Sequence, residues 1–353
     1  MKAILRDYEG YYLDAEMQHY YYDRKLYSLQ LEVTSFCDQG CYFCYTRGSK
    51  SAREMPANFV RSILDSAAAM AVRKIDWLGG DPLKKSDWYE LMIYSNDLGF
   101  INNIWTTGNL LSDPVIAEKA VAVTEGGLIS VHFDTFSPTL YERLHRVPPS
   151  FVDQILQGLR NVINLGKPPE ELYHCITFTK LQAGSDFQQT VDRLLDELDI
   201  PTGIVPYKPA LPDYDYLIPS SEEIREALEY KNKRCLGVDI PIIPQCVSKF
   251  YCGTTAALIN GDALSLCSRI RHVVARLENH TFCDVFNDHR HSLLKIPLRT
   301  LTNLPQICQS CELNTICFGC RSNAWYYAYD FLARDPKCWK MGRSEETVEC
   351  EEV

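Results

Sequence analysis

The sequence lacks any hydrophobic run that could cross a membrane or direct export through one. No stretch approaches the ~18 apolar residues of a transmembrane helix, and residues 1–29 lack the apolar core of a secretory signal peptide. We therefore expect a cytoplasmic protein with no membrane partner. Disulfides are disfavoured in that reducing compartment, so metal binding is the ordinary explanation for patterned cysteines.

Clusters of basic residues are also missing. The chain has 36 Lys and Arg against 46 Asp and Glu, a net charge of −10, and no basic run of five or more residues. A nucleic-acid surface needs clustered cations, so we expect no nucleic-acid partner. The acidic balance fits a cationic or neutral substrate better than an anionic one.

Short apolar runs alternate with amphipathic helical stretches between residues 28 and 207. Six β/α units in ~180 residues predict a parallel sheet, and a closed eight-fold barrel normally needs ~250 residues. We therefore expect an α/β fold, an open partial (β/α)6 TIM-like barrel. The predicted strands are 28–34, 74–80, 101–109, 127–135, 173–180 and 202–207, and the predicted helices are 58–71, 88–99, 113–123, 150–166 and 186–198.

The rest of the chain divides by composition. Eleven of the fifteen cysteines lie between Cys235 and Cys350, which indicates a cysteine-rich C-terminal module. The tyrosine-rich stretch 21–27 suits an edge strand on the barrel or a surface that binds a peptide. The predicted divisions are an N-terminal extension (1–27), the barrel (28–207), a connector (208–245) with a helix at 220–233, the cysteine-rich domain (246–345) and a tail (346–353).

Three cysteines, Cys37, Cys41 and Cys44, directly follow the first predicted strand. The carboxyl ends of parallel strands form the functional mouth of such a barrel, so we expect these thiols there. Three thiolates are one fewer than a closed zinc or iron–sulfur site needs. A zinc site with a fourth ligand from elsewhere and an iron–sulfur cluster with one open iron are both consistent with this spacing.

This loop, with Phe43 before the third cysteine, resembles the Cys-x3-Cys-x-aromatic-Cys signature of the radical SAM superfamily. The resemblance implies that the cysteines hold a [4Fe–4S] cluster whose open iron binds S-adenosylmethionine, with Phe43 against the adenine. Gly79-Gly80-Asp81-Pro82 resembles the family's Gly-Gly-Glu-Pro segment, with Asp in place of Glu. It implies a backbone site for the methionine amino group, where glycines let the chain approach the ligand closely.

Further cofactor contacts are expected on the third and fourth strands. Thr107 and Asn109 stand in "TTGN", which resembles the family's Thr-Asn-Gly element. Ser130, His132 and Asp134 alternate, so their side chains face one side of their strand. Polar groups inside a barrel are costly unless they line a cavity, so we assign them to the cofactor site. The alternative is the solvent face of an edge strand.

Eight cysteines of the C-terminal module resemble the SPASM extension of radical SAM enzymes, which implies two auxiliary [4Fe–4S] clusters. A zinc ribbon over residues 308–320 is the alternative, but it leaves four of the eight unexplained. Of the remaining cysteines, Cys175 and Cys283 are candidate hydrogen-atom donors, and Cys235 and Cys350 have no assigned role. The implied ligands are Cys246, Cys252, Cys267 and Cys320 for the first cluster, and Cys308, Cys311, Cys317 and Cys338 for the second.

The resemblance implies an oxidoreductase that cleaves S-adenosylmethionine to a 5′-deoxyadenosyl radical and abstracts a substrate hydrogen atom, with the auxiliary clusters accepting or relaying an electron. Our main hypothesis is natural-product maturation, by oxidation or cross-linking of a ribosomally made (RiPP) peptide. Alternatives are a dehydrogenase or epimerase of an amino sugar or aminocyclitol, an anaerobic sulfatase-type maturase, and a non-enzymatic iron–sulfur electron carrier. Ser268 and Arg269 follow Cys267 where sulfatase maturases have Asp, which disfavours that alternative.

The implied partners follow from this chemistry. The enzyme would need an external electron donor of the flavodoxin or ferredoxin type. We expect residues 1–27 to be too few for a peptide-leader recognition domain, so the leader of a peptide substrate would bind through a separate leader-binding protein or through the tyrosine-rich N-terminus.

Overall fold

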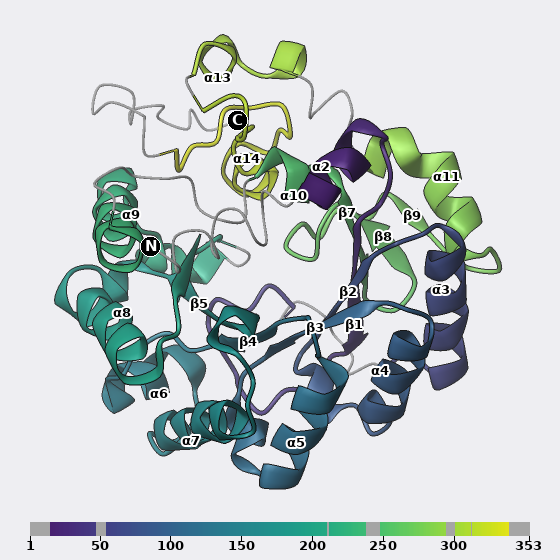
Figure 1. Ribbon diagram of the computed structural model, residues 1–353. Helices are drawn as coiled ribbons and strands as arrows, with labels where there is room; N and C mark the ends of the chain where they lie inside the picture. Colours follow the sequence, from purple (N-terminus) through teal and green to yellow (C-terminus); the bar gives the residue numbers. More distant parts are fainter. Residues whose placement is uncertain are drawn as a thin grey trace.

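A nine-stranded sheet organises the described part of the chain, in the order β6-β5-β4-β3-β2-β1-β7-β8-β9 (Figure 1). The structure is a computed structural model that describes residues 15–46, 54–209, 212–237, 248–293, 301–311 and 313–338. The strands are β1 (Ser28–Thr34), β2 (Lys74–Gly79), β3 (Ile101–Thr106), β4 (Ile129–His132), β5 (Leu172–Phe178), β6 (Thr202–Pro206), β7 (Thr255–Ile259), β8 (Ala263–Ser265) and β9 (Ala275–Arg276).

Neighbouring strands from β6 to β7 in this order are parallel, and β8 and β9 are antiparallel. Strands β6 and β9 are the edges of this sheet, which does not close. The predicted fold class, an α/β partial TIM-like barrel, is confirmed. The third and fourth strands are shorter than predicted. The third ends early because Gly108 turns the chain after β3 with a φ of 86°.

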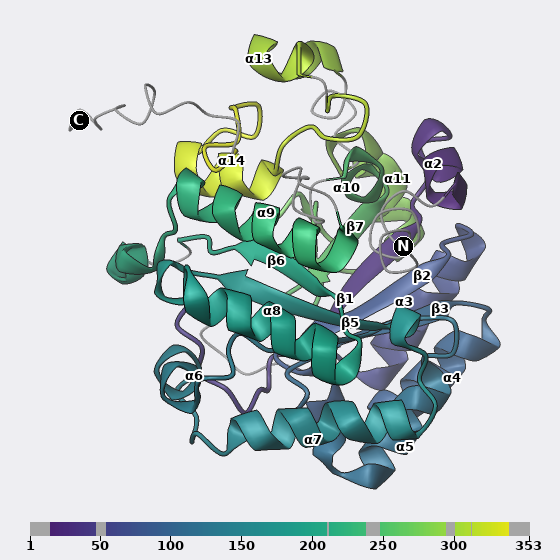
Figure 2. The same ribbon diagram turned by 60° about the vertical axis from the view of Figure 1, so that its left-hand side comes forward.

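Helices cover the outer face of the sheet (Figure 2). The predicted helices are present with shifts of one to three residues at their ends, since capping rather than periodicity decides the terminal turn. The helices of the barrel are α3 (Ala57–Ala69), α4 (Trp88–Asp97), α5 (Pro114–Val123), α6 (Pro138–His145), α7 (Phe151–Asn164), α8 (Ser185–Leu198) and α9 (Ser221–Leu236). Short 3₁₀ turns are η2 (Pro82–Lys84), η3 (Asn109–Ser112), η4 (Pro169–Glu171), η5 (Lys180–Gln182), η6 (Pro212–Leu217) and η8 (Leu301–Asn303).

Helix α6 is the barrel helix that the sequence did not predict. It is eight residues long and is capped by Ser137, whose hydroxyl accepts a hydrogen bond from the Leu140 backbone N–H at 3.3 Å. Its inward residues Tyr141, Leu144 and His145 are fully buried. This helix matters below because it supplies a wall of the functional site.

The cysteine-rich module shares the sheet of the barrel. Strand β7 pairs in parallel with β1, so the sheet continues across the boundary predicted at residue 245. Arg271 Nη1 lies 2.5 Å from Glu32 Oε1 on β1, and Arg271 Nη2 donates to Asn260 Oδ1 at 2.7 Å. The module's helices are α10 (Lys249–Gly253), α11 (Phe282–Leu293), α13 (Gln306–Gln309) and α14 (Arg321–Ala328).

The tyrosine-rich stretch 21–27 begins with the last two residues of a helix, α2 (Ala15–Tyr22). The interpretation of this stretch as an edge strand is therefore wrong. Residues three and four apart share a helix face, and here Met17 is buried while Tyr21 meets the ring of Phe250 edge to face at 5.2 Å. Tyr20 donates to the carbonyl of Ala71 at 2.7 Å. Packing against α10 therefore explains the helix.

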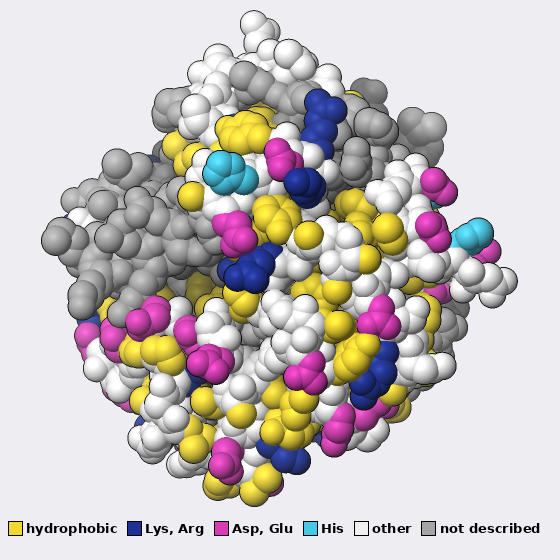
Figure 3. All heavy atoms as spheres, turned by 45° about the vertical axis from the view of Figure 1, so that its right-hand side comes forward, with side chains coloured by type: hydrophobic (Ala, Val, Ile, Leu, Met, Phe, Trp, Pro, Cys, Tyr) yellow, Lys and Arg dark blue, Asp and Glu magenta, His cyan; other side chains and the backbone are white. Residues whose placement is uncertain are grey.

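Acidic and basic side chains are interspersed on the face shown in Figure 3, with apolar side chains between them. No basic patch gathers on that face. Across the described ranges, every helix is too short or too polar to cross a bilayer.

Candidate functional site

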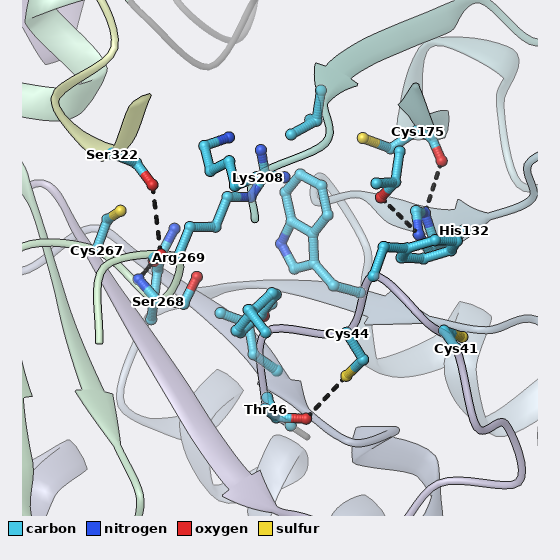
Figure 4. Close-up of a pocket in the computed structure, with 18 of the residues that line it drawn as sticks. Cys41, Cys44, Thr46, His132, Cys175, Lys208, Cys267, Ser268, Arg269 and Ser322 are labelled. Atoms are coloured by element: carbon cyan, nitrogen blue, oxygen red, sulfur yellow. Dashed lines mark hydrogen bonds between the residues drawn. The ribbon is translucent and has the colours of Figure 1, made fainter. Parts of the chain in front are cut away.

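A cavity of about 460 Å³ lies at the carboxyl ends of the parallel strands. Cys37, Cys41 and Cys44 all line it, as their position after β1 predicts. Figure 4 shows Cys41 and Cys44 at one side of the cavity. The strand ends contribute Gly79 and Gly80 at the end of β2, Thr106 and Thr107 at β3, Ser130 and His132 on β4, Cys175 and Thr177 on β5, and Val205 and Pro206 on β6.

Backbone hydrogen bonds hold the three-cysteine loop on two sides. On one side, the N–H of Gly80 donates to Thr34 O and that of Asp81 to Phe36 O, each at 2.7 Å. On the other, the N–H of Gly40 donates to the carbonyl of His145 at the end of α6, at 2.9 Å. The loop is therefore fixed before any ligand binds.

The packing of this loop requires the two glycines at the end of β2, Gly79 and Gly80. A Cβ atom on Gly79 would lie 2.2 Å from Thr34 O, and one on Gly80 would lie 2.3 Å from Phe36 O. Close approach to the cysteine loop therefore excludes any side chain at either position. Both glycines also line the cavity, which is compatible with the backbone contact to a ligand that the sequence predicts.

The thiols suit a metal cluster. Burial raises the pKa of Cys37 to about 12 and also raises that of Cys41, so a bound metal is needed to hold them as thiolates near neutral pH. Among the described residues, no three His, Cys, Asp or Glu side chains converge on one point as ligands of a single ion would. Three thiolates can bind three irons of a multi-iron cluster and leave the fourth iron without a protein ligand, which is what the sequence predicts for this loop.

Phe43 is buried and lines the cavity. Its ring meets that of His132 at 5.7 Å and that of His145 at 5.2 Å, edge to face in both cases. These two contacts fix the ring of Phe43, which the resemblance to the radical SAM signature assigns to the adenine of S-adenosylmethionine.

Asp81 and Asn109 are turned into the protein and do not line the cavity. Asp81 Oδ2 accepts from Thr106 Oγ1 at 2.7 Å and from Thr107 N at 3.0 Å, and its Oδ1 caps η2 through Leu83 N. Burial raises the pKa of Asp81, and the threonine hydrogen bonds oppose that rise. Asn109 Nδ2 donates to Asp38 Oδ2 at 3.2 Å. These residues, like buried Pro82, position the segments that do line the site.

Strand β4 pairs with β3 and β5, so the alternative of a solvent-exposed edge strand is wrong. Ser130 and His132 line the cavity as predicted. Two hydrogen bonds fix the ring of His132. Its Nδ1 lies 2.8 Å from the carbonyl oxygen of Cys175, and its Nε2 lies 3.0 Å from Thr177 Oγ1. Asp134 lies beyond the strand end, fully buried behind the lining.

His145 is a site residue that sequence reasoning missed. Its Nε2 lies 2.9 Å from Asp134 Oδ2, and its Nδ1 lies 3.1 Å from Cys41 Sγ. Burial alone would raise the pKa of Asp134, but His132 and His145 hold it below its usual range, so the carboxylate is ionised. Asp134 therefore orients the imidazole of His145, which also contacts Cys41, a predicted cluster ligand. No local pattern marks His145, because only the packing of α6 brings it here.

The module contributes the opposite side of the cavity. Cys252, Cys267 and Cys320 line it, and Figure 4 shows Cys267 across from Cys41 and Cys44. Burial raises the pKa of Cys267, and the nearby Cys320 adds to the rise. Cys246, assigned with these three, lies outside the described residues.

The second predicted ligand group, which includes Cys308, also contains thiols that influence one another. Burial raises the pKa of Cys317, and Cys338 and Cys311 add to the rise. The described members of this group are absent from the cavity lining, so the two predicted groups occupy different places.

The four cysteines without a ligand assignment are scattered. Cys175 lines the cavity, whereas Cys235 packs in the apolar cluster between α8 and α9. Cys283 lies on α11 and accepts a hydrogen bond from Asn287 Nδ2 at 3.3 Å, away from the cavity. Only Cys175 of the two hydrogen-donor candidates is therefore near the site. Cys350 lies outside the described residues.

Solved structures with this fold include SuiB from Streptococcus suis bound to S-adenosylmethionine, with a TM-score of 0.65 and 19% identity over 89% of this chain and 77% of that chain. Another is anSMEcpe with bound AdoMet, with a TM-score of 0.65 and 15% identity over 88% of this chain and 93% of that chain. At these identities, the likeness shows the fold alone.

Curated relatives include proteins named "Probable GTP 3′,8-cyclase". That from Methanosarcina mazei is 26% identical over 159 residues, 43% of this chain and 46% of the relative. That from Methanothermobacter thermautotrophicus is 29% identical over 153 residues, 42% of this chain and 48% of the relative. The chain thus spans about half the length of the curated relatives it matches.

The family model of the radical SAM superfamily matches residues 31–194, from β1 to α8. That range holds the three-cysteine loop, the Gly79–Gly80 turn and the polar end of β4. Residues 31–194 are a radical SAM domain.

Proposed function

We propose that the protein is a radical SAM enzyme that binds a [4Fe–4S] cluster and S-adenosylmethionine at one end of the cavity and a substrate at the other. The observation that carries this is the common lining: Cys37, Cys41 and Cys44 share one cavity with the Gly79–Gly80 turn and with Ser130 and His132. When bound, the cluster supplies the electron that cleaves S-adenosylmethionine reductively.

The protein's own residues would place the cofactor. The three cysteines would leave one metal position without a protein ligand, and the cavity-lining backbone at Gly79 and Gly80 suits an amino group. Phe43 offers an apolar ring for the adenine. Thr107, Ser130 and His132 supply polar atoms, while Asp81, Pro82, Asn109 and Asp134 hold these segments in place through buried contacts. The enclosing walls limit competing water.

The C-terminal cysteines would hold the two auxiliary clusters in the groups assigned above, with Cys246 completing the first. Four thiolates close each cluster, which favours electron transfer over substrate binding. The proposed reaction is therefore an oxidation, with a flavodoxin- or ferredoxin-type donor supplying the initiating electron.

For the substrate, we favour a peptide. Another structure of SuiB is bound to its precursor peptide SuiA, and it shares this fold with a TM-score of 0.67 at 18% identity over 92% of this chain and 79% of that chain. The GTP 3′,8-cyclase relatives suggest a small nucleotide as the second candidate. Their match reaches only about half of their length.

Electron paramagnetic resonance of the anaerobically reconstituted and reduced protein tests this proposal. Addition of S-adenosylmethionine should change the spectrum of one cluster, because the cofactor binds its open iron. The Cys37→Ala variant should lose that change, whereas Cys283→Ser, on α11, should keep it. A spectrum that S-adenosylmethionine leaves unchanged in the unmodified protein would contradict the proposal.

A further inference from the structure

The Lys, Arg, Asp and Glu side chains in the described lining of the cavity are all of one sign. The lining includes Lys208, Arg269 and Arg321, and among the described residues that line it there is no Asp or Glu. The chain as a whole carries a net charge of −10. The cavity therefore has the opposite electrostatic character to the protein around it, and opposite to the substrate charge that composition suggests.

One of the three cations has a structural task. Arg321 is buried at the start of α14, and its Nη1 donates to Phe331 O at 2.7 Å and Ala333 O at 2.9 Å, while Nη2 donates to Phe318 O at 2.7 Å. These bonds direct its guanidinium to backbone carbonyls of the module. Lys208 and Arg269 remain as the cations that can serve a ligand.

Arg269 is held on a rigid segment of the module. The backbone N–H of the preceding Ser268 donates to Gln30 Oε1 on β1 at 2.9 Å, and Ser322 on α14 donates to the carbonyl of Arg269 at 3.3 Å. The side chain reaches the thiol of Cys175 on β5. It therefore crosses the cavity from the module toward the barrel (Figure 4).

Lys208 enters from the other direction, two residues after β6. Its Nζ donates to Pro206 O at a long 3.4 Å, and no acidic side chain in the described ranges forms an ion pair with it. The segment is fixed by Tyr327 of α14, whose hydroxyl donates to the carbonyl of Tyr207 at 2.8 Å. Lys208 and Arg269 thus converge from two anchored segments, away from Cys41 (Figure 4).

We infer that Lys208 and Arg269 form a subsite for an oxyanion, a carboxylate or phosphate group of the substrate. Two anchored cations in a cavity whose described lining holds no acidic side chain favour such a group and disfavour a cationic substrate. The planar guanidinium can bind two oxygens of one group, and the ammonium adds a point charge. This inference rests on the proposed function in that the bound molecule is taken to be the enzyme's substrate.

Calorimetric titration of the anaerobically reconstituted full-length protein tests the subsite. The probes are inorganic pyrophosphate and succinate, with neutral succinamide as the control, so the two anions distinguish a phosphate from a carboxylate source. At least one anion should bind with a stoichiometry of one per chain, and more weakly at high salt. Arg269→Gln and Lys208→Met should each weaken binding about tenfold, since a charge-assisted hydrogen bond is lost.

Two further variants keep the test decisive. Arg276→Gln is the matched control, because that arginine also belongs to the module but pairs with Asp262 at 2.7 Å outside the cavity; it should bind the anion normally. Arg269→Lys keeps the charge and should bind more tightly than Arg269→Gln. Equal binding in all variants, or no binding of either anion to the unmodified protein, would overturn the inference.

Iron content and 5′-deoxyadenosine formation are measured on the same preparations. Loss of iron in Arg269→Gln and Lys208→Met without anion binding would assign the cations to balancing a cluster, which overturns the subsite. Formation of 5′-deoxyadenosine without anion binding would leave the proposed function standing and the subsite refuted. Anion binding that depends on both residues, without 5′-deoxyadenosine, would support the site and contradict the proposed function.

Discussion

The carboxylate of Asp134 holds the imidazole of His145 at 2.9 Å, and both side chains are completely buried. The other ring nitrogen lies 3.1 Å from Cys41 Sγ. A residue on α6 is therefore oriented by a residue after β4 against a predicted cluster ligand. Partners of this kind fix a metal ligand in place and tune the metal.

Asp134→Asn removes the negative charge that orients His145. Such changes commonly lower metal affinity or activity by 10- to 100-fold, and we expect a loss of about tenfold in 5′-deoxyadenosine formation together with an altered spectrum of the reduced cluster. Asp186→Asn is the control, because Asp186 accepts from Thr135 Oγ1 at 2.7 Å outside the cavity lining. Equal spectra for the two variants would argue against an influence of Asp134 on the cluster through His145 and Cys41.

Gly80→Ala should impair cluster assembly. The added methyl group would lie 2.3 Å from Phe36 O, so the cysteine loop must move. We expect iron and sulfide per chain to fall. Gly99→Ala provides the comparison: its Cβ meets nothing within 4 Å, although its φ of 88° makes the alanine strained by roughly 1 to 2 kcal/mol. That variant should lose stability and keep its iron, whereas equal iron content in both would refute the packing argument.

The pair of Glu32 and Arg271 joins the barrel to the module in the interior, with side-chain exposures of 6% and 20%. Arg271→Met leaves the Glu32 carboxylate buried without its cation and should lower the free energy of unfolding by about 3 kcal/mol. The double variant Glu32→Gln/Arg271→Met should recover much of that loss. Urea unfolding of Glu32→Gln, Arg271→Met and the double variant measures the coupling free energy between the two residues. Losses of the two single variants that add up in the double variant would contradict the coupling.

His174 makes stability depend on pH. Burial lowers its pKa to about 4, whereas the unfolded chain binds this proton near pH 6.5. The unfolded state therefore binds more protons between these values, so stability is fully present above pH 6.5 and falls as the pH drops toward 4. The residue should contribute a loss of roughly 1 kcal/mol between pH 7.5 and 5.5. His174→Asn should reduce that slope in urea unfolding; an unchanged slope would contradict the assignment.

The sequence predicts the barrel well because its signals are local. Strand β1 and helix α7 follow from short-range periodicity, and the three-cysteine loop follows from its place after β1. Helix α6 escapes prediction because one short helix directly after a strand leaves little periodicity. The pairing of β7 with β1 joins residues more than 200 positions apart, which no local pattern records.

The residues of the candidate site also divide into those that local sequence predicts and those that only the folded structure reveals. Gly80 could be predicted because it ends the second predicted strand, and Ser130 because it lies on the polar side of the fourth. His145, Lys208 and Arg269 come to the cavity only through tertiary packing, and overall charge even points away from a cationic cavity. Asp81 and Asn109 were assigned to the cofactor from motif position, whereas the structure turns their side chains into the protein.

The cluster count tests the module. Three [4Fe–4S] clusters require about 12 iron atoms per chain. Cys267→Ala should reduce this to about 8 and leave the cluster of Cys37, Cys41 and Cys44 intact. A content of about 4 in the unmodified protein would contradict both auxiliary assignments.

Formation of 5′-deoxyadenosine tests whether the protein is a radical SAM enzyme. The anaerobically reconstituted protein, reduced with dithionite and given S-adenosylmethionine, should produce 5′-deoxyadenosine and methionine in equal amounts, and Cys41→Ala should produce neither. Protein that carries its iron and sulfide but forms no 5′-deoxyadenosine, with or without candidate substrates, would contradict the account.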